Sequence, residues 1–174
     1  DNTDPNSLVS RFRRARARRI VDMITRAHAE KGAVNIIDLG GEANYWTLFD
    51  PELLQSCKVR ITLVNPGGID EVADPGLFTI IDGDACALPQ YGDHAFDMVH
   101  SNSVIEHVGD WTRMEAFAAE CRRLAPRYYV QTPYFWFPVE PHFSAPFFHW
   151  RSEQSRAKSL LKRRHGFSQK APDM

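Results

Sequence analysis

Polar side chains follow four short apolar runs of the chain, at positions where they could bind a small ligand. They are Asp38 with Gly40 and Gly41, Asn65, Asp84 with Ala85, and Asn102 with Ser103. Glycine lets backbone N–H groups approach a ligand closely, and short polar side chains can hydrogen-bond a nucleoside. Each residue by itself also suits a turn or a cap. Their recurrence at four successive run ends favours a nucleotide-type binding site.

Five apolar runs have the length of strands that are buried on both faces. They cover residues 34–39, 59–64, 77–82, 96–101 and 128–132, and the intervening segments can hold helices or turns. Such alternation predicts an α/β fold with a mainly parallel sheet and helices on both faces. The carboxyl ends of parallel strands meet at one edge, where ligands of open α/β sheets bind. We therefore expect the polar run ends to lie close together.

Two helices are predicted from apolar residues at three- and four-residue steps. One covers residues 8–30, with Ser7 as its cap and arginines between its apolar positions, and the other covers residues 111–124 before Pro126. Residues 133–150 combine prolines with many aromatic side chains, which excludes an ordinary helix or central strand. We expect this segment to line or cover a pocket.

The composition excludes several classes of protein. The chain has 174 residues, 43% hydrophobic and 25% charged, which suits one globular domain. No apolar run is long enough to span a bilayer, and the first residues lack the pattern of a signal peptide. Three widely spaced cysteines indicate neither a disulfide framework nor a zinc site. These features predict a cytoplasmic protein without a membrane span.

Charge is distributed unevenly along the chain, although the formal net charge is only −1. Residues 11–19 hold six arginines and residues 151–165 hold six Lys or Arg, whereas residues 20–150 hold eight basic and eighteen acidic residues. Basic ends can bind nucleic acid, or they can be solvated helix faces on an acidic body. The second interpretation is favoured, because acidic residues in the middle would repel a phosphate backbone.

Three segments together resemble class I S-adenosylmethionine-dependent methyltransferases. They are residues 36–41 (IIDLGG), 83–85 (GDA) and 96–108 (FDMVHSNSVIEHV), and the last is similar to the fourth-strand signature of the type 11 methyltransferase group. Residues 131–133 and 140–143, with Trp46 downstream of the Gly-Gly turn, resemble a small bacterial subgroup. The resemblance implies a Rossmann-like sheet, S-adenosylmethionine as cofactor and methyl transfer to an unidentified acceptor, expected to be a small molecule.

The resemblance also implies roles for the run-end residues. Asp38, Gly40 and Gly41 would hold the amino-acid end of the cofactor and Asn65 its ribose. Asp84 and the backbone of Ala85 would meet the adenine, and Asn102 and Ser103 would lie beside the sulfonium. The sequence departs from the family pattern at Glu42 and Asn44, which replace glycines, and at Asn65, which replaces an acidic ribose ligand. A neutral hydrogen bond is about half as strong as a charge-assisted one, so these departures bear on cofactor affinity.

Methyl transfer needs alignment and exclusion of water more than dedicated catalytic groups. If the acceptor is a hydroxyl, a general base would assist, and Glu106, His107 and His142 are the candidate catalytic residues, with Glu140 nearby. Glu106 and His107 also suit a helix start, and His142 suits a loop contact to backbone. No spacing of His, Cys, Asp and Glu matches a metal-ligand motif, so no metal is expected.

Two alternative functions stay open. The departures at Glu42, Asn44 and Asn65 suit a methyltransferase-like binding module with weak cofactor binding. The basic N-terminal helix and C-terminal segment suit an RNA-directed methyltransferase, which is the less favoured alternative.

One domain over residues 1–174 is expected, in four parts. They are the basic helix (8–30), the cofactor-binding core (34–132), the Pro and aromatic loop (133–150) and a basic segment (151–174). The family usually completes its sheet with an antiparallel hairpin after the fifth strand, and residues 151–174 show no alternating strand pair. An open sheet edge would then leave a homodimer open as an alternative.

Overall fold

A computed structural model describes residues 8–68 and 74–133, with side chains from residue 15 onward, and a few positions between 139 and 155. The chain divides into two compact units, residues 1–132 and 133–174, and each is described by itself. The expectation of one domain over residues 1–174 stays a prediction.

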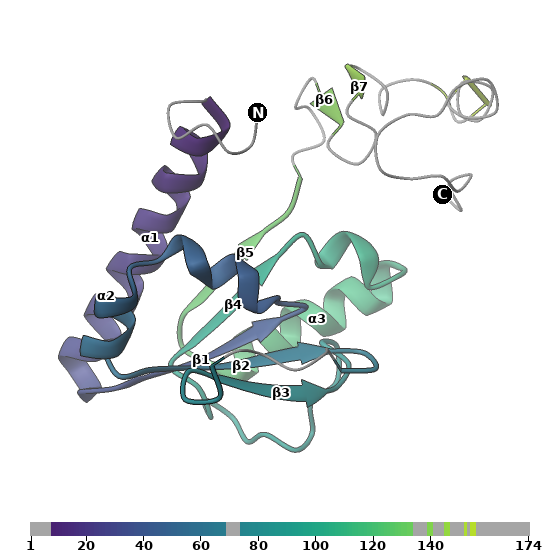
Figure 1. Cartoon of the computed structure of the whole chain (residues 1–174). Helices are drawn as coiled ribbons and strands as arrows, with labels where there is room; N and C mark the ends of the chain where they lie inside the picture. Colours follow the sequence, from purple (N-terminus) through teal and green to yellow (C-terminus); the bar gives the residue numbers. More distant parts are fainter. Residues whose placement is uncertain are drawn as a thin grey trace. The chain divides into compact units, whose positions relative to one another are not determined.

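The first unit contains a parallel five-stranded sheet (Figure 1). Its strands are β1 (Val34–Leu39), β2 (Val59–Asn65), β3 (Phe78–Asp82), β4 (Met98–Asn102) and β5 (Tyr128–Gln131). The spatial order is β3-β2-β1-β4-β5, so the order reverses beside β1. Ligands of such sheets bind outside the carboxyl ends at this reversal. The predicted α/β fold with a parallel sheet is confirmed.

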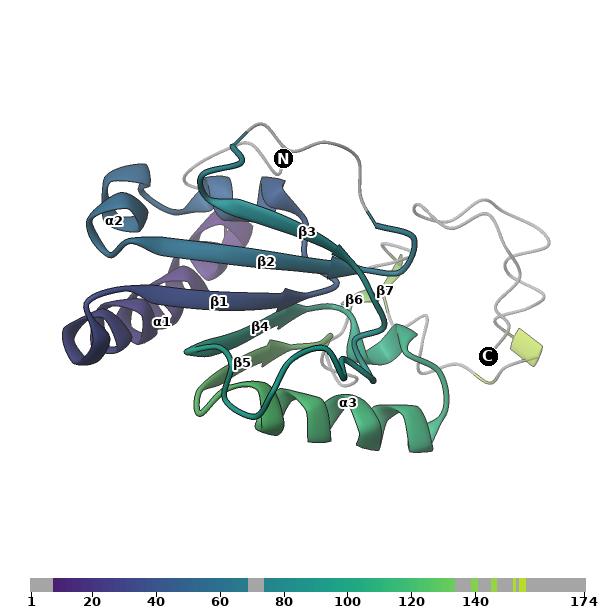
Figure 2. The ribbon, with the colours of Figure 1, turned by 90° about the horizontal axis from the view of Figure 1, so that it is seen from below.

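Helices cover both faces of the sheet (Figure 2). On one face, Ile20 and Ile24 of helix α1 (Leu8–Lys31) pack in one cluster with Trp46 and with the even-numbered residues of β1. On the other face, Phe117 of helix α3 (Trp111–Leu124) packs with odd-numbered residues such as Ile37. Because successive strand side chains point to opposite faces, each buried strand contributes to two cores.

Local signals set the helix boundaries. Asp50 caps the short helix α2 (Pro51–Ser56) by accepting from the Glu52 N–H at 2.9 Å. Asp110 caps α3 by accepting from the Arg113 N–H at 3.0 Å. Two 3₁₀ helices, η1 (Ala43–Leu48) and η2 (Ile105–His107), follow β1 and β4 and shape the carboxyl edge of the sheet.

In the second unit, β6 (Val139–Glu140) and β7 (Ala145–Pro146) form a separate antiparallel pair. They lie within the segment expected to be a loop, whose remaining residues, apart from Pro133, are outside the described part, as is the predicted cap Ser7. In the described part of the chain, no helix is long and apolar enough to cross a membrane.

Candidate functional site

A cavity of about 510 Å³ lies at the carboxyl edge of the sheet. Gly40 and Gly41 line it from the turn after β1, Asn102 from β4, Gln131 from β5 and Arg16 from α1. This volume is within the usual range for sites that bind small molecules, about 300 to 1,000 Å³. The cavity therefore lies where the sequence predicts a binding site.

The Gly-Gly turn is close-packed against the protein on its inner side. Gly40 has a φ of +70°, and a Cβ there would lie 2.4 Å from a methyl carbon of Val104. A Cβ on Gly41 would lie 2.1 Å from the carboxyl carbon of Asp38. Both positions require glycine, since these neighbours are packed side chains close to the backbone rather than flexible ends.

Asp38 is completely buried, and both carboxylate oxygens are engaged within the chain. Trp46 Nε1–H donates to Oδ2 at 2.8 Å, and His100 Nδ1 lies 2.6 Å from Oδ1. An ionised carboxylate only accepts hydrogen bonds, so His100 Nδ1 carries the hydrogen. The Asp38 side chain, predicted to hold a cofactor, thus contacts its own fold, although it also lines the cavity.

His100 is 1% exposed, lines the cavity, and has no hydrogen-bond partner for Nε2 within the described structure. Its ring centroid lies 4.7 Å from that of Tyr45 and 5.9 Å from that of Tyr129, whose plane is parallel. Burial, followed by Tyr129 and Asp38, raises the pKa of Tyr45 to about 12. The Tyr45 phenol therefore stays protonated at neutral pH, and the rings fix the His100 side chain.

Asn102 and Ser103, predicted to lie beside a sulfonium, both line the cavity. Asn102 Oδ1 is buried and has no hydrogen-bond partner among the described groups. Ser103 has a φ of 59°, and its N–H donates to Gln131 O at 2.8 Å. A buried acceptor without a partner is costly, so a ligand donor at Asn102 would relieve that cost.

The predicted nucleoside residues Asn65, Asp84 and Ala85 do not line this cavity. The Asn65 amide donates to Gly41 O at 2.8 Å and thereby braces the glycine turn. Asp84 accepts from the Cys86 N–H at 2.9 Å and from Arg113 Nη2 at 2.7 Å. The Cys86 N–H and then Arg113 hold the pKa of Asp84 below its usual range.

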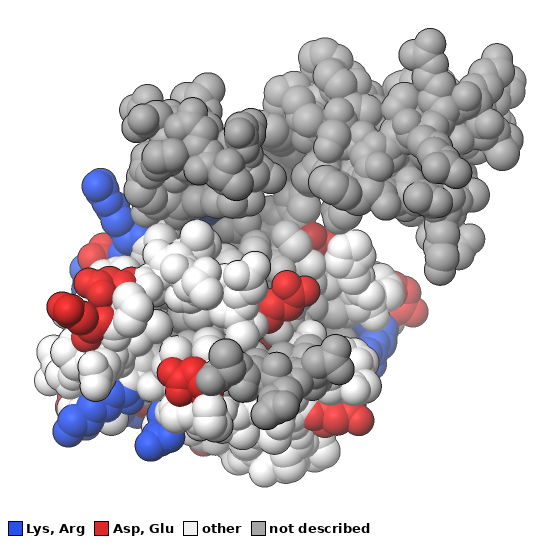
Figure 3. Space-filling model, viewed as in Figure 1, with Lys and Arg blue, Asp and Glu red and all other residues white. Residues whose placement is uncertain are grey.

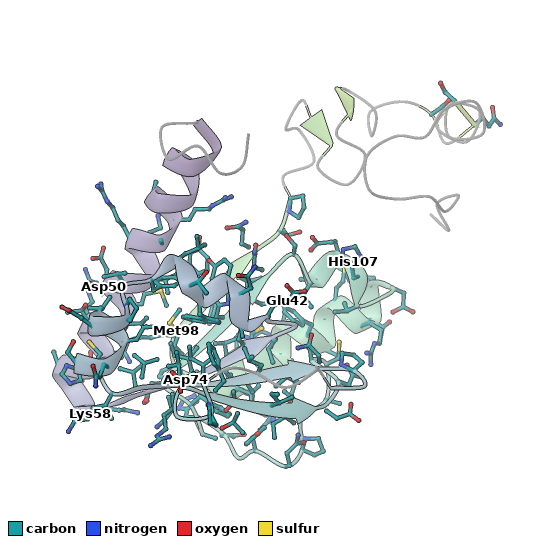
Figure 4. All side chains as sticks on the ribbon, viewed as in Figure 1. Glu42, Asp50, Lys58, Asp74, Met98 and His107 are labelled. Atoms are coloured by element: carbon teal, nitrogen blue, oxygen red, sulfur yellow. The ribbon has the colours of Figure 1, made fainter. Side chains whose placement is uncertain are left out.

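The predicted bases are distributed around the edge rather than gathered in the cavity. Glu106 accepts from Thr132 Oγ1 at 3.0 Å, and its other oxygen is buried without a partner in the described structure. His107 is exposed, and neither residue lines the cavity. In Figure 4, His107 lies on the α3 side, whereas Glu42 follows β1. His142 is outside the described residues.

Glu42 and Asn44, which replace family glycines, line the cavity and are exposed. Their side chains form part of its wall and leave a volume of about 510 Å³ open.

Sequence reasoning did not assign His100, Arg16 and Gln131 to the site. Arg16 and Gln131 carry no motif, because helix docking and strand pairing bring them to the cavity. His100 had a usable signal, since it is a titratable residue within an apolar strand, and the register places it directly opposite Asp38. A buried carboxylate and a histidine at paired positions indicate a dyad.

All three cysteines are free and buried. Within the described ranges, no three His, Cys, Asp or Glu side chains cluster in a way that could hold a metal ion.

Comparisons with known proteins find a family model that matches part of the chain. Residues 49–127 match the model of the family described as methyltransferase domain, a range that runs from α2 to α3 and does not include the Gly-Gly turn. A comparison with curated proteins gives no match.

Two solved structures are similar to the chain. One is a provisionally assigned S-adenosyl-L-methionine-dependent methyltransferase from Methanococcus maripaludis, at 16% identity and a TM-score of 0.43. The similarity covers 63% of this chain and 53% of that one, so the chain spans about half its length. The other is such a methyltransferase from Aquifex aeolicus, at 14% identity and a TM-score of 0.43, covering 74% and 70%.

The family match confirms the resemblance seen in the sequence, and the strand order agrees with the predicted sheet. Residues 49–127 are thus similar to the methyltransferase domain family, and the first unit of the chain has a Rossmann-like parallel sheet.

Proposed function

We propose that the protein is an S-adenosylmethionine-dependent methyltransferase that acts on a small-molecule acceptor. The observation that carries the proposal is the cavity at the carboxyl edge, lined by the Gly-Gly turn and by Asn102 with its unpartnered Oδ1. The family match supplies the class of reaction.

The residues around the cavity fit the amino-acid end of the cofactor. Backbone groups of Gly40 and Gly41 would hold that end, and the unpartnered Asn102 Oδ1 would accept from its ammonium group. Arg16 offers a cation for the carboxylate. The proposed nucleoside contacts of Asn65, Asp84 and Ala85 lie outside the cavity and stay predictions. When bound, the cofactor supplies an electrophilic methyl group.

The chain's own contribution would be to orient the acceptor and exclude water from the cavity. Tyr45 and Leu48 provide apolar lining surface, which suits a small organic acceptor. We include a cytoplasmic location in the proposal, because three buried free thiols suit a reducing compartment.

Isothermal titration with S-adenosylmethionine and S-adenosylhomocysteine tests the proposal. The folded protein should bind both compounds, and Asn102→Ala should weaken binding by about tenfold, the effect of one lost hydrogen bond. Asn35→Ala is the matched control, since Asn35 is an exposed strand asparagine at the other end of β1. Absence of heat and of a thermal shift at millimolar ligand would contradict the proposal.

A second candidate is a methyltransferase-like binding module with weak cofactor binding. It is favoured by Asn65 and Asp84, whose polar groups already bond within the chain. This candidate predicts that the wild-type protein shows no measurable binding of S-adenosylmethionine. Glu42→Gly, which removes a side chain from the cavity rim, should then gain measurable binding.

On the face shown in Figure 3, the described Lys and Arg side chains are interspersed with Asp and Glu. On that face, the mixing is unlike the continuous basic surface expected for phosphate contacts, so it does not favour the RNA-directed alternative.

A further inference from the structure

We propose that His100 Nε2 accepts the proton of a hydroxyl acceptor bound in the cavity, and that Asp38 is its positioning residue. The inference rests on the proposed function and deepens it, because it assigns the acceptor to the class of neutral hydroxyl compounds.

The first step of the argument is the tautomer of His100. Asp38 Oδ1 lies 2.6 Å from Nδ1 and accepts a hydrogen bond from the Nδ1–H group. Nε2 of the neutral ring therefore carries a lone pair and no hydrogen. The two nitrogens lie on different sides of the imidazole, which directs Nε2 away from Asp38. This atom has no partner within the described structure, and its residue lines the cavity.

The second step is the electrostatic setting of the pair. Asp38 and His100 are 0% and 1% exposed, and Trp46 holds the other carboxylate oxygen at 2.8 Å. A buried carboxylate stabilises the imidazolium that forms when Nε2 gains a proton. Nε2 is itself buried and has no partner among the described groups, a costly arrangement that a ligand donor at this atom would relieve.

The third step is the chemical class of the acceptor. A carboxylate acceptor has no proton to lose, so it would make no use of a base at Nε2. A hydroxyl must lose its proton as the new bond forms, and a general base assists that loss. The O–H bond breaks and its proton adds to Nε2, while the oxygen forms the bond to the methyl carbon and the C–S electron pair stays on sulfur. The imidazolium then returns the proton to solvent.

Nitrogen NMR of histidine side chains in the full chain tests the proton acceptor directly. In the free protein, His100 should show the Nδ1–H tautomer, with Nε2 carrying no hydrogen. The charged or titratable groups facing this ring are Asp38 on β1, Tyr45 on η1 and Tyr129 on β5, with Arg16 on α1 and Glu42 lining the same cavity.

Asp38→Asn tests the positioning role. An amide at position 38 no longer acts only as an acceptor, so the preference of His100 for the Nδ1–H tautomer should be lost in the nitrogen spectrum. Asp97→Asn is the matched control, because Asp97 is also buried but bonds Lys31 and the Asn35 N–H at the other end of the strands. A merely structural Asp38 would leave the tautomer of His100 unchanged.

The hydroxyl class is tested with phenol as the probe and anisole as its methyl-ether control, both added to protein saturated with S-adenosylhomocysteine. The phenol should shift the Nε2 signal, and the ether, which has no proton to donate, should not. An unmoved Nε2 signal with millimolar phenol, or a His100 ring that carries its hydrogen on Nε2 in the free protein, would overturn the inference. Failure of S-adenosylhomocysteine to bind would instead count against the proposed function.

Discussion

Two aspartates lie at the carboxyl edge of the sheet, Asp38 within the end of β1 and Asp84 just after β3, and their surroundings differ completely. Asp38 is fully buried and bonds Trp46 and His100. Asp84 is 45% exposed and bonds Arg113 and the Cys86 N–H. The resemblance assigned both to one cofactor. Their environments show that a residue type at a strand end does not fix a role, because burial decides how much each hydrogen bond is worth.

The largest effect is expected for Asp38→Ala. The change leaves Trp46 Nε1–H and His100 Nδ1 buried without their acceptor, and it opens a void next to both rings. We expect a loss of about 3 kcal/mol or more in the free energy of unfolding, measured by urea denaturation. A loss below about 1 kcal/mol would mean that water replaces the carboxylate.

A smaller but still large effect is expected for Gly41→Ala. Its Cβ would meet the Asp38 carboxyl carbon at 2.1 Å, and Asp38 is held by two hydrogen bonds and cannot move freely. Overpacking of this kind costs about 1 to 3 kcal/mol in the free energy of unfolding. Gly92→Ala is the control, since nothing lies within 4 Å of its Cβ position. Equal melting temperatures for the two variants would contradict the close packing.

Arg113→Gln removes the guanidinium that pairs with the exposed aspartate, Asp84. The guanidinium is one cause of the lowered pKa of Asp84, so that pKa should rise in the variant, as followed by carboxyl carbon NMR. Because both side chains are nearly half exposed, the change in unfolding free energy should be smaller than for either variant above. A loss of unfolding free energy as large as that of Gly41→Ala would show that the exposed Asp84–Arg113 ion pair stabilises the fold more than its exposure predicts.

The smallest effect is expected for Asp84→Asn, and it should depend on pH. The folded-state pKa of Asp84 lies below its ordinary value of 3.8, so its contribution to stability is present above that value. The contribution is lost as pH falls through the folded-state pKa. Wild type should therefore exceed the variant in unfolding free energy at neutral pH by more than at pH of about 3. A constant difference would contradict the assignment.

The sheet and its edge could be predicted from the sequence because each strand is an apolar run that ends in a polar residue. Val34–Leu39 shows this, since its buried residues alternate between two cores while Gly40 and Gly41 end it. The same pattern at the end of β4 places Asn102 and Ser103 in the lining of the cavity.

The partners of each side chain could not be predicted in the same way. Asn65 and Arg113 bond groups 24 and 29 residues away, and such pairing depends on the packed fold rather than on local pattern. His100 lay within a run that was treated as apolar, so its pairing with Asp38 became visible only from the strand register.

The bond from Asn65 to the carbonyl of Gly41 has a consequence for how such a site can change. An aspartate at position 65 would place a carboxylate oxygen against a carbonyl oxygen, and two acceptors repel each other. An acidic residue at position 65 would therefore lose this bond and repel the Gly41 carbonyl oxygen. The end of β2 and the glycine turn are coupled through this bond, so a change at position 65 also acts on the backbone of the turn.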